Sequence, residues 1–383
     1  MLKKFALKNY KNFKNEIEIN FGNVAGYQFS TDCICDGKIS KMLIYGRNAT
    51  GKTNLGEAIM DISSTIFPKL MISEDRAFLN ADSMEDSAGF SYTFDFNGKE
   101  LVYRYERYSE QILKTEELIV DGVTIFKCDF LNNEFSFDNL KHVGAEIANV
   151  DRYKSSLKAD EYFNKNIEQL PFLRWIINNV ALNSDSVLKH LDDYVRRMKL
   201  IKVGNDFLHR MHRVGDFFLG SLDNPKTTKD LEDFLNAMGV DCKLIVKKLP
   251  DGQNELYFAH EKLVPFYENA SSGTLALVNL YQWIAPVVWE PSFVYLDEFD
   301  AFYHYEMAEN VMRYFKKKYP RCQVIMTSHN TNLMTNRLMR PDCMFILSRR
   351  GTLTALCNAT DRELREGHNL GKMYISGEFE RYE

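Results

Sequence analysis

Three short stretches hold residues whose types and spacing suit phosphate chemistry. The first, Gly46 to Thr53, reads G-R-N-A-T-G-K-T. Its two glycines let the loop curl so that backbone N–H groups point at phosphate oxygens. Lys52 can reach the β- and γ-phosphates of a nucleotide, and the Thr53 hydroxyl can ligate Mg²⁺. The pattern predicts an ATP and Mg²⁺ site built from Gly46, Arg47, Asn48, Ala49, Thr50, Gly51, Lys52, Thr53 and Asn54.

The second stretch, Ser292 to Asp300, is an apolar run that ends in acidic residues. Placing carboxylates at the end of a buried strand costs free energy unless a cation and a substrate face them. We therefore expect Asp297 to hold Mg²⁺, through water or together with Thr53. We expect Glu298 to orient and deprotonate an attacking water.

The third stretch, Thr327 to Asn330, reads T-S-H-N and follows the apolar run Cys322 to Met326. Ligands of α/β sheets bind at the carboxyl ends of the strands, and a polar cluster there predicts a binding role. His329 follows Glu298 by 31 residues, so the order of the motifs favours a site residue over an isolated histidine.

The flanking segments predict the elements that position these residues. Met42 to Tyr45 is a short buried strand, and Leu55, Ala58, Ile59, Ile62 and Ile66 form one stripe on a helix that starts near Lys52. Leu2 to Phe21 resembles two strands of a hairpin. Gly89 to Tyr108 alternates with strand period around Asn97-Gly98, and another pair turns at Asp121-Gly122. These pairs predict an antiparallel β-lobe.

From about Val150 to Leu235 the pattern becomes helical, without the heptads of a long coiled coil. Basic residues gather at 196–199 and 210–213, but acidic residues interleave with them, which favours a solvated helix face over a nucleic-acid patch. Thr274 to Trp289 is the most apolar run and reads as a buried helix, too short to span a bilayer comfortably.

Bulk composition narrows the class of protein. The 383 residues suit one large nucleotide-binding domain with an inserted or appended lobe. A net charge of −5 gives no global attraction to nucleic acid or to anionic membranes. The seven cysteines, with one C-x-C pair at Cys33 and Cys35, show no zinc pattern and suit free thiols in a reducing cytosol. We expect a cytoplasmic protein without a signal peptide or membrane contact.

In this order, the motifs resemble those of the ABC-type ATPase superfamily. Ala270 to Thr274 is similar to its L-S-G-G-E/Q signature, which in that family faces the ATP of a partner subunit, and it departs from the pattern at Ser272 and Thr274. The resemblance implies nucleotide contacts for Ser271, Ser272 and Gly273, a γ-phosphate switch role for His329, and contact between heads at Asp300. Asn9 to Phe13 is similar to the opening of SMC and recombination-repair ATPases. Lys11 then stands at a phosphate-contacting position, with a solvated turn lysine as the alternative.

Narrower similarity is to the OLD-like and abortive-infection ATPases of bacterial anti-phage defence. It rests on Tyr45 to Leu55, on Leu296 to His304 and on the tail Arg365 to Tyr374. OLD proteins add a TOPRIM nuclease, and the 54 residues after His329 are too few for one. The resemblance therefore implies an effector, a nuclease or toxin, encoded by a neighbouring gene. Two-gene systems such as PARIS, with its ATPase AriA, and the ATPase–RloB pairs are built in this way.

The fold class predicted is α/β, an ABC-type P-loop ATPase head with a mixed sheet, an antiparallel β-lobe and an inserted helical lobe. The boundaries are 1–148 for the N-terminal half of the head, 149–265 for the mainly helical insertion and 266–383 for the C-terminal half. We expect a slow ATPase without its own nuclease, in a homo-oligomer of head-to-head dimers, that senses a phage-encoded trigger and holds or releases its effector. The alternatives are an SMC-like repair ATPase acting on DNA ends and a transporter-type subunit.

Overall fold

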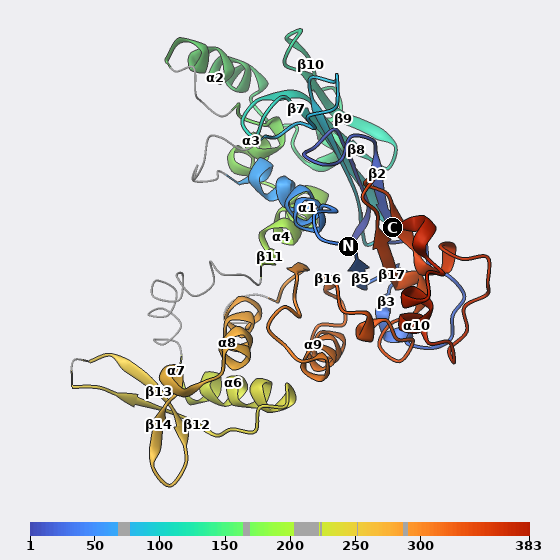
Figure 1. Ribbon diagram of the computed structural model, residues 1–383. Helices are drawn as coiled ribbons and strands as arrows, with labels where there is room; N and C mark the ends of the chain where they lie inside the picture. The colour runs from blue at the N-terminus through green and yellow to red at the C-terminus, as the bar shows by residue number, and fades with distance from the viewer. Residues whose placement is uncertain (68–76, 164–168, 203–221, 223, 251, 286–289) are drawn as a thin grey trace.

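The computed structural model describes residues 1–67, 77–163, 169–202, 222, 224–250, 252–285 and 290–383. Two large sheets lie in this part of the chain, and a small third sheet projects at the lower left of Figure 1. A short ribbon pairs β3 (Ile34–Cys35) with β4 (Lys38–Ile39).

The central sheet has six strands in the order β11-β15-β16-β5-β17-β18. Its first five strands run parallel and β18 pairs antiparallel with β17. Every residue of β5, β15 and β16 is buried, which is typical of parallel strands covered on both faces. The strands are β5 (Lys41–Tyr45), β11 (Met198–Lys202), β15 (Phe293–Asp297), β16 (Gln323–Ser328), β17 (Met344–Leu347) and β18 (Leu353–Ala355).

The second sheet is the predicted antiparallel β-lobe, with seven strands in the order β10-β9-β8-β7-β6-β1-β2. Alternate residues of β6 face inward, and Tyr92 on that strand donates to the Ala58 carbonyl of helix α1 (Lys52–Ile66) at 2.8 Å. Asn97 and Gly98 both have positive φ, as a tight hairpin turn requires. The strands are β1 (Leu2–Lys8), β2 (Ile17–Asn20), β6 (Ala88–Phe96), β7 (Lys99–Arg107), β8 (Leu113–Val120), β9 (Val123–Asp129) and β10 (Glu134–Ser136).

Three helices follow the β-lobe: α2 (Val150–Phe163), α3 (Phe172–Asn179) and α4 (Val187–Arg196). The first amides of α3 donate to the buried carboxylate of Glu116 on β8, from Phe172 at 2.7 Å and from Leu173 at 2.9 Å. Glu116 thereby satisfies donors that a helix start leaves open, and it fixes α3 to the β-lobe.

The helical prediction is wrong at Met198–Lys202, which forms β11 and pairs in parallel with β15. Met198 and Ile201 are buried while Lys202 is exposed, so this strand closes one edge of the central sheet. Arg196 belongs to the end of α4, where it pairs with Asp192 at 2.9 Å and stacks over Phe67. The second basic group, 210–213, lies outside the described residues.

The lower part of Figure 1 combines helices with the small sheet β12-β13-β14. Phe234 of α6 lies 5.3 Å from Tyr281 of α8 and 4.9 Å from Tyr314 of α9, measured between ring centroids, so the three helices pack together. The elements are α6 (Pro225–Ala237), β12 (Leu244–Lys248), β13 (Asn254–Ala259), β14 (Leu263–Pro265), α7 (Phe266–Asn269), α8 (Ser272–Ile284) and α9 (Tyr305–Lys318). The buried helix predicted from Thr274 is α8.

Near the end of the chain lies α10 (Leu370–Ile375), which packs against the short 3₁₀ turn η3 (Thr331–Leu333). The mixed sheet, its flanking helices and the antiparallel lobe confirm the predicted α/β class with a mixed sheet and an antiparallel β-lobe. None of the helices in the described ranges is long and apolar enough to cross a membrane.

Candidate functional site

The phosphate loop, Gly46–Thr53, connects β5 to α1 as predicted. Ala49 and Gly51 have φ of 63° and 100°, and such left-handed residues turn successive N–H groups toward one side of a loop. A Cβ atom at Gly46 would lie 2.6 Å from Thr50 Oγ1 and 3.0 Å from the carbonyl oxygen of Leu347. Packing therefore requires glycine at Gly46, and the backbone conformation favours it at Gly51.

Lys52 lies inside this loop and is almost fully buried. Its Nζ donates to the carbonyl oxygens of Gly46 at 2.8 Å and Arg47 at 3.1 Å. Burial lowers the pKa of Lys52, and the nearby carboxylates of Glu298 and Asp297 act in the opposite direction. The arrangement fixes a buried ammonium group inside the loop.

Asp297 ends β15 and is held by two hydroxyl groups. Thr53 Oγ1 donates to Asp297 Oδ2 at 2.6 Å, and Thr327 Oγ1 donates to Asp297 Oδ1 at 2.9 Å. Burial raises the pKa of Asp297, the two hydroxyls lower it, and the charge of Glu298 raises it further. A carboxylate beside a hydroxyl fits Mg²⁺, which prefers oxygen ligands and is often bound by few protein groups together with phosphate and water. Among the described residues, no group of three or more His, Cys, Asp or Glu forms a metal cluster of its own.

Glu298 has a φ of 49°, a conformation that costs free energy in a residue other than glycine. Its amide donates to Thr327 Oγ1 at 2.8 Å, and its carboxylate is 45% exposed. The backbone thus turns immediately after Asp297, so that the second carboxylate faces the open side of the site. A half-exposed carboxylate in this place can take a proton from water.

His329 connects Glu298 with the phosphate loop. Its Nε2 lies 3.2 Å from Glu298 Oε1, while its Nδ1 lies 3.0 Å from the Gly46 carbonyl oxygen and 3.3 Å from Lys52 Nζ. The structure therefore brings together residues from three strand ends, β5, β15 and β16, as the sequence predicted.

Asp300 faces into its own chain. Ser328 Oγ donates to Asp300 Oδ2 at 2.7 Å, and burial raises the pKa of this carboxyl. The contact ties the loop after β15 to the turn before His329. A role for Asp300 between two heads stays a prediction.

The signature-like segment begins α8. Ser271 Oγ accepts a hydrogen bond from the Thr274 amide at 3.1 Å, and Ser271 and Ser272 are exposed. A Cβ atom at Gly273 would lie 3.1 Å from the carbonyl oxygen of Phe302, in the loop that follows Asp300. Within the described part of the chain, no hydrogen bond joins Ser271–Thr274 to the phosphate loop. The structure thus places this segment next to the Asp300 loop.

Lys11 pairs with Glu57 on α1, and Lys202 at the end of β11 pairs with the same carboxylate. Burial would raise the pKa of Glu57, but the two lysines outweigh it and lower that pKa. The Lys11 side chain is 14% exposed, so the solvated alternative is wrong. Contact between Lys11 and phosphate stays a prediction.

Three partners of the site escaped the sequence analysis. Asn12 Nδ2 donates to the Thr50 carbonyl at 2.9 Å, and Asn12 Oδ1 accepts from Asn54 Nδ2 at 2.8 Å. Thr327 orients Asp297, as described above, and Glu383 binds Arg47. Asn12 lies in the stretch Asn9 to Phe13 and Thr327 in the stretch Thr327 to Asn330, and both positions were usable signals. No sequence signal pointed to Glu383, because its contact with Arg47 spans 336 positions.

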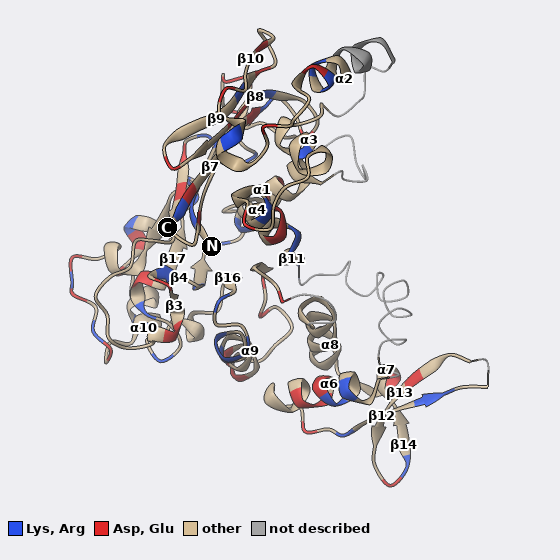
Figure 2. Cartoon of the chain, turned by 180° about the vertical axis from the view of Figure 1, so that it is seen from behind, with Lys and Arg blue, Asp and Glu red and all other residues tan. Residues whose placement is uncertain are grey.

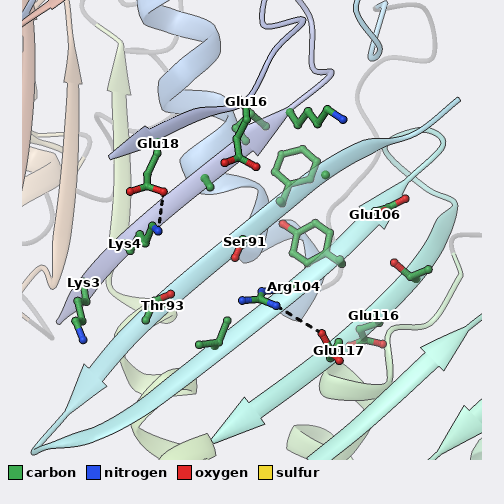
Figure 3. Close-up of a pocket in the computed structure, with 18 of the residues that line it drawn as sticks. Lys3, Lys4, Glu16, Glu18, Ser91, Thr93, Arg104, Glu106, Glu116 and Glu117 are labelled. Atoms are coloured by element: carbon green, nitrogen blue, oxygen red, sulfur yellow. Dashed lines mark ion pairs between the residues drawn. The ribbon is translucent and has the colours of Figure 1, made fainter. Parts of the chain in front are cut away.

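A separate cavity of about 770 Å³ opens on the outer face of the β-lobe (Figure 3). Its lining carries ion pairs between Lys4 and Glu18 at 2.6 Å and between Arg104 and Glu117 at 4.0 Å. None of its lining residues belongs to the site predicted from the sequence. These pairs join neighbouring strands, and the predicted chemistry lies elsewhere.

Comparisons with solved structures find heads of SMC proteins. The SMC head domain from Thermotoga maritima is 16% identical, with a TM-score of 0.45, and the match covers 92% of this chain and 98% of that one. An Smc head domain with an extended coiled coil, bound to the C-terminal domain of ScpA and derived from Pyrococcus furiosus, is 15% identical with a TM-score of 0.45, covering 93% and 96%. A comparison with curated protein sequences finds no match.

A comparison with protein families matches residues 41–335 to the family described as "AAA domain, putative AbiEii toxin, Type IV TA system". The matched range begins with β5 and ends after η3, so it includes the phosphate loop, the start of α8, Asp297, Glu298 and His329. Because the match covers more than half of the chain, the protein belongs to this AAA family and is a P-loop ATPase.

Proposed function

We propose that the protein binds ATP at the phosphate loop and hydrolyses it to ADP and phosphate. The network from Lys52 through His329 to Glu298 carries this proposal, because it places an ammonium, an imidazole and a carboxylate around one point. Lys52 and the loop amides bind the phosphates. Glu298 accepts a proton from the attacking water, and His329 holds the Glu298 carboxylate and contacts the γ-phosphate.

Thr53 and Asp297 are the residues that would hold Mg²⁺. Their oxygens lie 2.6 Å apart at the start of α1, next to the phosphate loop. When bound, the cation supplies positive charge to the β- and γ-phosphate oxygens. Thr327 contributes by keeping Asp297 turned toward Thr53.

We infer that the working site needs a second copy of the chain. Ser271, Ser272 and Gly273 start a helix, and helix starts bind phosphate through their amides and their dipole. Gly273 lies against the loop after Asp300, and the two serines are exposed. A head-to-head dimer would place them on the γ-phosphate held by the partner, with Asp300 near the dimer axis. Larger assemblies of such dimers are part of the proposal. So is an insertion at residues 149–265, of which the strand Met198–Lys202 joins the central sheet.

In the cell, we propose a sensor and scaffold of anti-phage defence that holds or releases a separate effector. The family description, which names an abortive-infection toxin and a toxin–antitoxin system, supports this reading. The tail Arg365 to Tyr374 and the phosphate-loop stretch Tyr45 to Leu55 support it as well, through their similarity to the OLD-like and abortive-infection ATPases. AriA of PARIS and the ATPases paired with RloB are the two-gene systems that the proposal takes as its examples. In the view of Figure 2, both signs of charge mix along α6 and α9, which does not favour duplex DNA as the main ligand.

A complementation experiment tests the composite site. Lys52→Ala removes the phosphate clamp, whereas Ser271→Arg blocks the signature surface and leaves the chain's own phosphate loop intact. Each variant alone should be inactive, and mixed dimers should regain up to one working site. Ser155→Arg, on an exposed face of α2, is the matched control for the added arginine and should keep full activity. If mixed dimers form and stay inactive, the composite site is wrong.

The cellular proposal needs its own test. Co-expression of the tagged chain with the product of the neighbouring gene should yield a complex that ATP, or a phage protein, dissociates. A titration with duplex DNA at rising salt concentration tests the alternative function. Tight duplex binding that weakens steeply with salt would support the repair ATPase instead.

A further inference from the structure

Glu383 binds the phosphate loop from a distant part of the sequence. Its carboxylate accepts a hydrogen bond from Arg47 Nε at 2.7 Å and forms an ion pair with the same guanidinium. Its main chain is held too, because the Arg349 amide donates to the Glu383 carbonyl at 3.0 Å. The Glu383 side chain is 12% exposed and that of Arg47 is 57% exposed, so Arg47 is the partner with room to move.

The segment that carries Glu383 also holds the loop after His329. A Cβ atom at Gly371, in α10, would lie 2.6 Å from the carbonyl oxygen of Thr331. Asn336 Nδ2 donates to the carbonyl oxygens of Arg365 at 2.9 Å and Glu366 at 3.1 Å. Residues 365–383 therefore contact the segments that follow two neighbouring strands, β5 and β16.

We propose that Glu383 is an autoinhibitory residue that competes with nucleotide phosphate for Arg47. This proposal rests on the proposed function, since it requires a nucleotide in the phosphate loop. Guanidinium groups bind phosphate as readily as carboxylate, in the same two-pronged geometry. A fixed carboxylate at the rim of an anion site also repels the anion. Both effects make polyphosphate binding weaker while Glu383 stays in place.

Binding of ATP then has a consequence outside the site. Once phosphate takes Arg47, Glu383 keeps its backbone contact to Arg349 and its side-chain interaction with Tyr374, but it loses its partner in the loop. The preceding turn, η6 (Glu380–Tyr382), is short and exposes Glu380 and Arg381, and it should open more often. Binding of phosphate in the loop thus changes how often residues 380–383 are open at the surface.

Glu383→Gln tests the proposal, with Glu380→Gln as its matched control. Glu380 lies in the same turn, is exposed and carries the same charge. ATP affinity is measured without Mg²⁺ to prevent turnover. Glu383→Gln should bind ATP about two- to fivefold more tightly, the range of an exposed ion pair, and the difference should shrink in high salt. Glu380→Gln should match the wild type. Equal or weaker ATP binding by Glu383→Gln overturns the proposal.

A double-mutant cycle and hydrogen exchange provide independent measurements. In the Arg47→Ala background, Glu383→Gln should change ATP affinity less than it does alone, whereas full additivity would contradict the shared contact. Amides of Tyr382 and Glu383 should exchange faster when ATP is added to the wild type, and unchanged exchange would also count against release. If the wild type binds no ATP, both proposals fail. If it binds ATP and Glu383→Gln does not differ from it, only this one fails.

Discussion

Thr53 Oγ1 donates to Asp297 Oδ2 at 2.6 Å, which joins the first turn of α1 to the last residue of β15 across 244 positions of sequence. Thr327 holds the other oxygen of the same carboxylate. Asp297 is therefore oriented by hydroxyls from two elements before any ligand arrives. Cation binding, proton transfer and the stability of the fold can therefore be tested with separate single substitutions at Thr53, Glu298 and Asp297.

Removal of the Thr53 hydroxyl should affect the Mg²⁺-dependent part of ATP binding. Thr53→Val keeps the shape of the side chain but loses one cation ligand and the hydrogen bond to Asp297. We expect Mg²⁺ to strengthen ATP binding in the wild type and to have little effect in this variant. Thr53→Ser, which keeps the hydroxyl, is the control and should resemble the wild type. Titrations of ATP with Mg²⁺ and with EDTA measure the difference.

Glu298→Gln should bind ATP and hydrolyse it about 10²–10⁴-fold more slowly, since the amide keeps the shape and loses the proton acceptor. The ATP-bound assembly should then accumulate, which light scattering with gel filtration can detect. Glu290→Gln, just before the opposite end of β15, should leave turnover unchanged. Normal steady-state turnover by Glu298→Gln would remove this residue from its assigned role.

The raised pKa of Asp297 gives a pH-dependent stability. Burial raises this pKa, and the hydrogen bonds from Thr53 and Thr327 do not cancel that effect. The folded state then binds the proton more readily than the unfolded chain, so stability falls as the pH rises from the ordinary value of about 3.9 to the raised one. Above the raised pKa, Asp297 is charged in both the folded and the unfolded state, and its full destabilising effect on the fold is present.

Asp297→Asn should therefore raise the Tm of the nucleotide-free protein at pH 7.5, by about 2 °C for each kcal/mol regained. The gain should shrink as the pH is lowered through the raised pKa. Asp241→Asn changes an exposed carboxylate and should show no such trend. Thermal unfolding at several pH values, together with loss of the Mg²⁺ effect on ATP binding, checks both parts.

Gly56 leaves room for Tyr295 against α1. A Cβ atom there would lie 2.5 Å from the Tyr295 ring, whose hydroxyl donates to the Lys52 carbonyl. Gly56→Ala should destabilise the protein by about 1–3 kcal/mol, because overpacking outweighs the gain in helix propensity. ATP affinity should fall with it, since Lys52 shifts. A Cβ atom added at Gly26 would meet nothing within 4 Å, so Gly26→Ala is the control. Chemical denaturation measures the free energy of unfolding of both variants.

Sequence reasoning succeeded where a pattern is local and strongly periodic. The strand and helix around the phosphate loop and the alternating strands around Asn97-Gly98 follow from side-chain spacing alone. The helical prediction failed at β11 because its five residues, which lie between basic neighbours, look like the end of a helix. What makes Met198–Lys202 a strand is its pairing with β15, almost a hundred positions away.

For the site as well, local motifs could be predicted from the sequence and long-range contacts could not. The identities of Lys52, Asp297, Glu298 and His329 came from motifs, and their gathering at one sheet edge came from topology. The Asn12 and Thr327 hydrogen bonds could not be predicted, because short polar side chains in loops have many candidate partners. For the same reason, the contact between Arg47 and Glu383 could not be read from spacing.

The strand order of the central sheet also constrains how this chain is made. The β5 strand lies between β16 and β17, so its neighbours leave the ribosome roughly 280 residues after it does. Until then its unpaired edges are exposed, and such edges promote aggregation in nascent chains. The β-lobe forms from sequential hairpins and can fold early, while the nucleotide-binding sheet closes last. Synthesis that stops before Met344 should therefore give a folded β-lobe attached to an insoluble remainder.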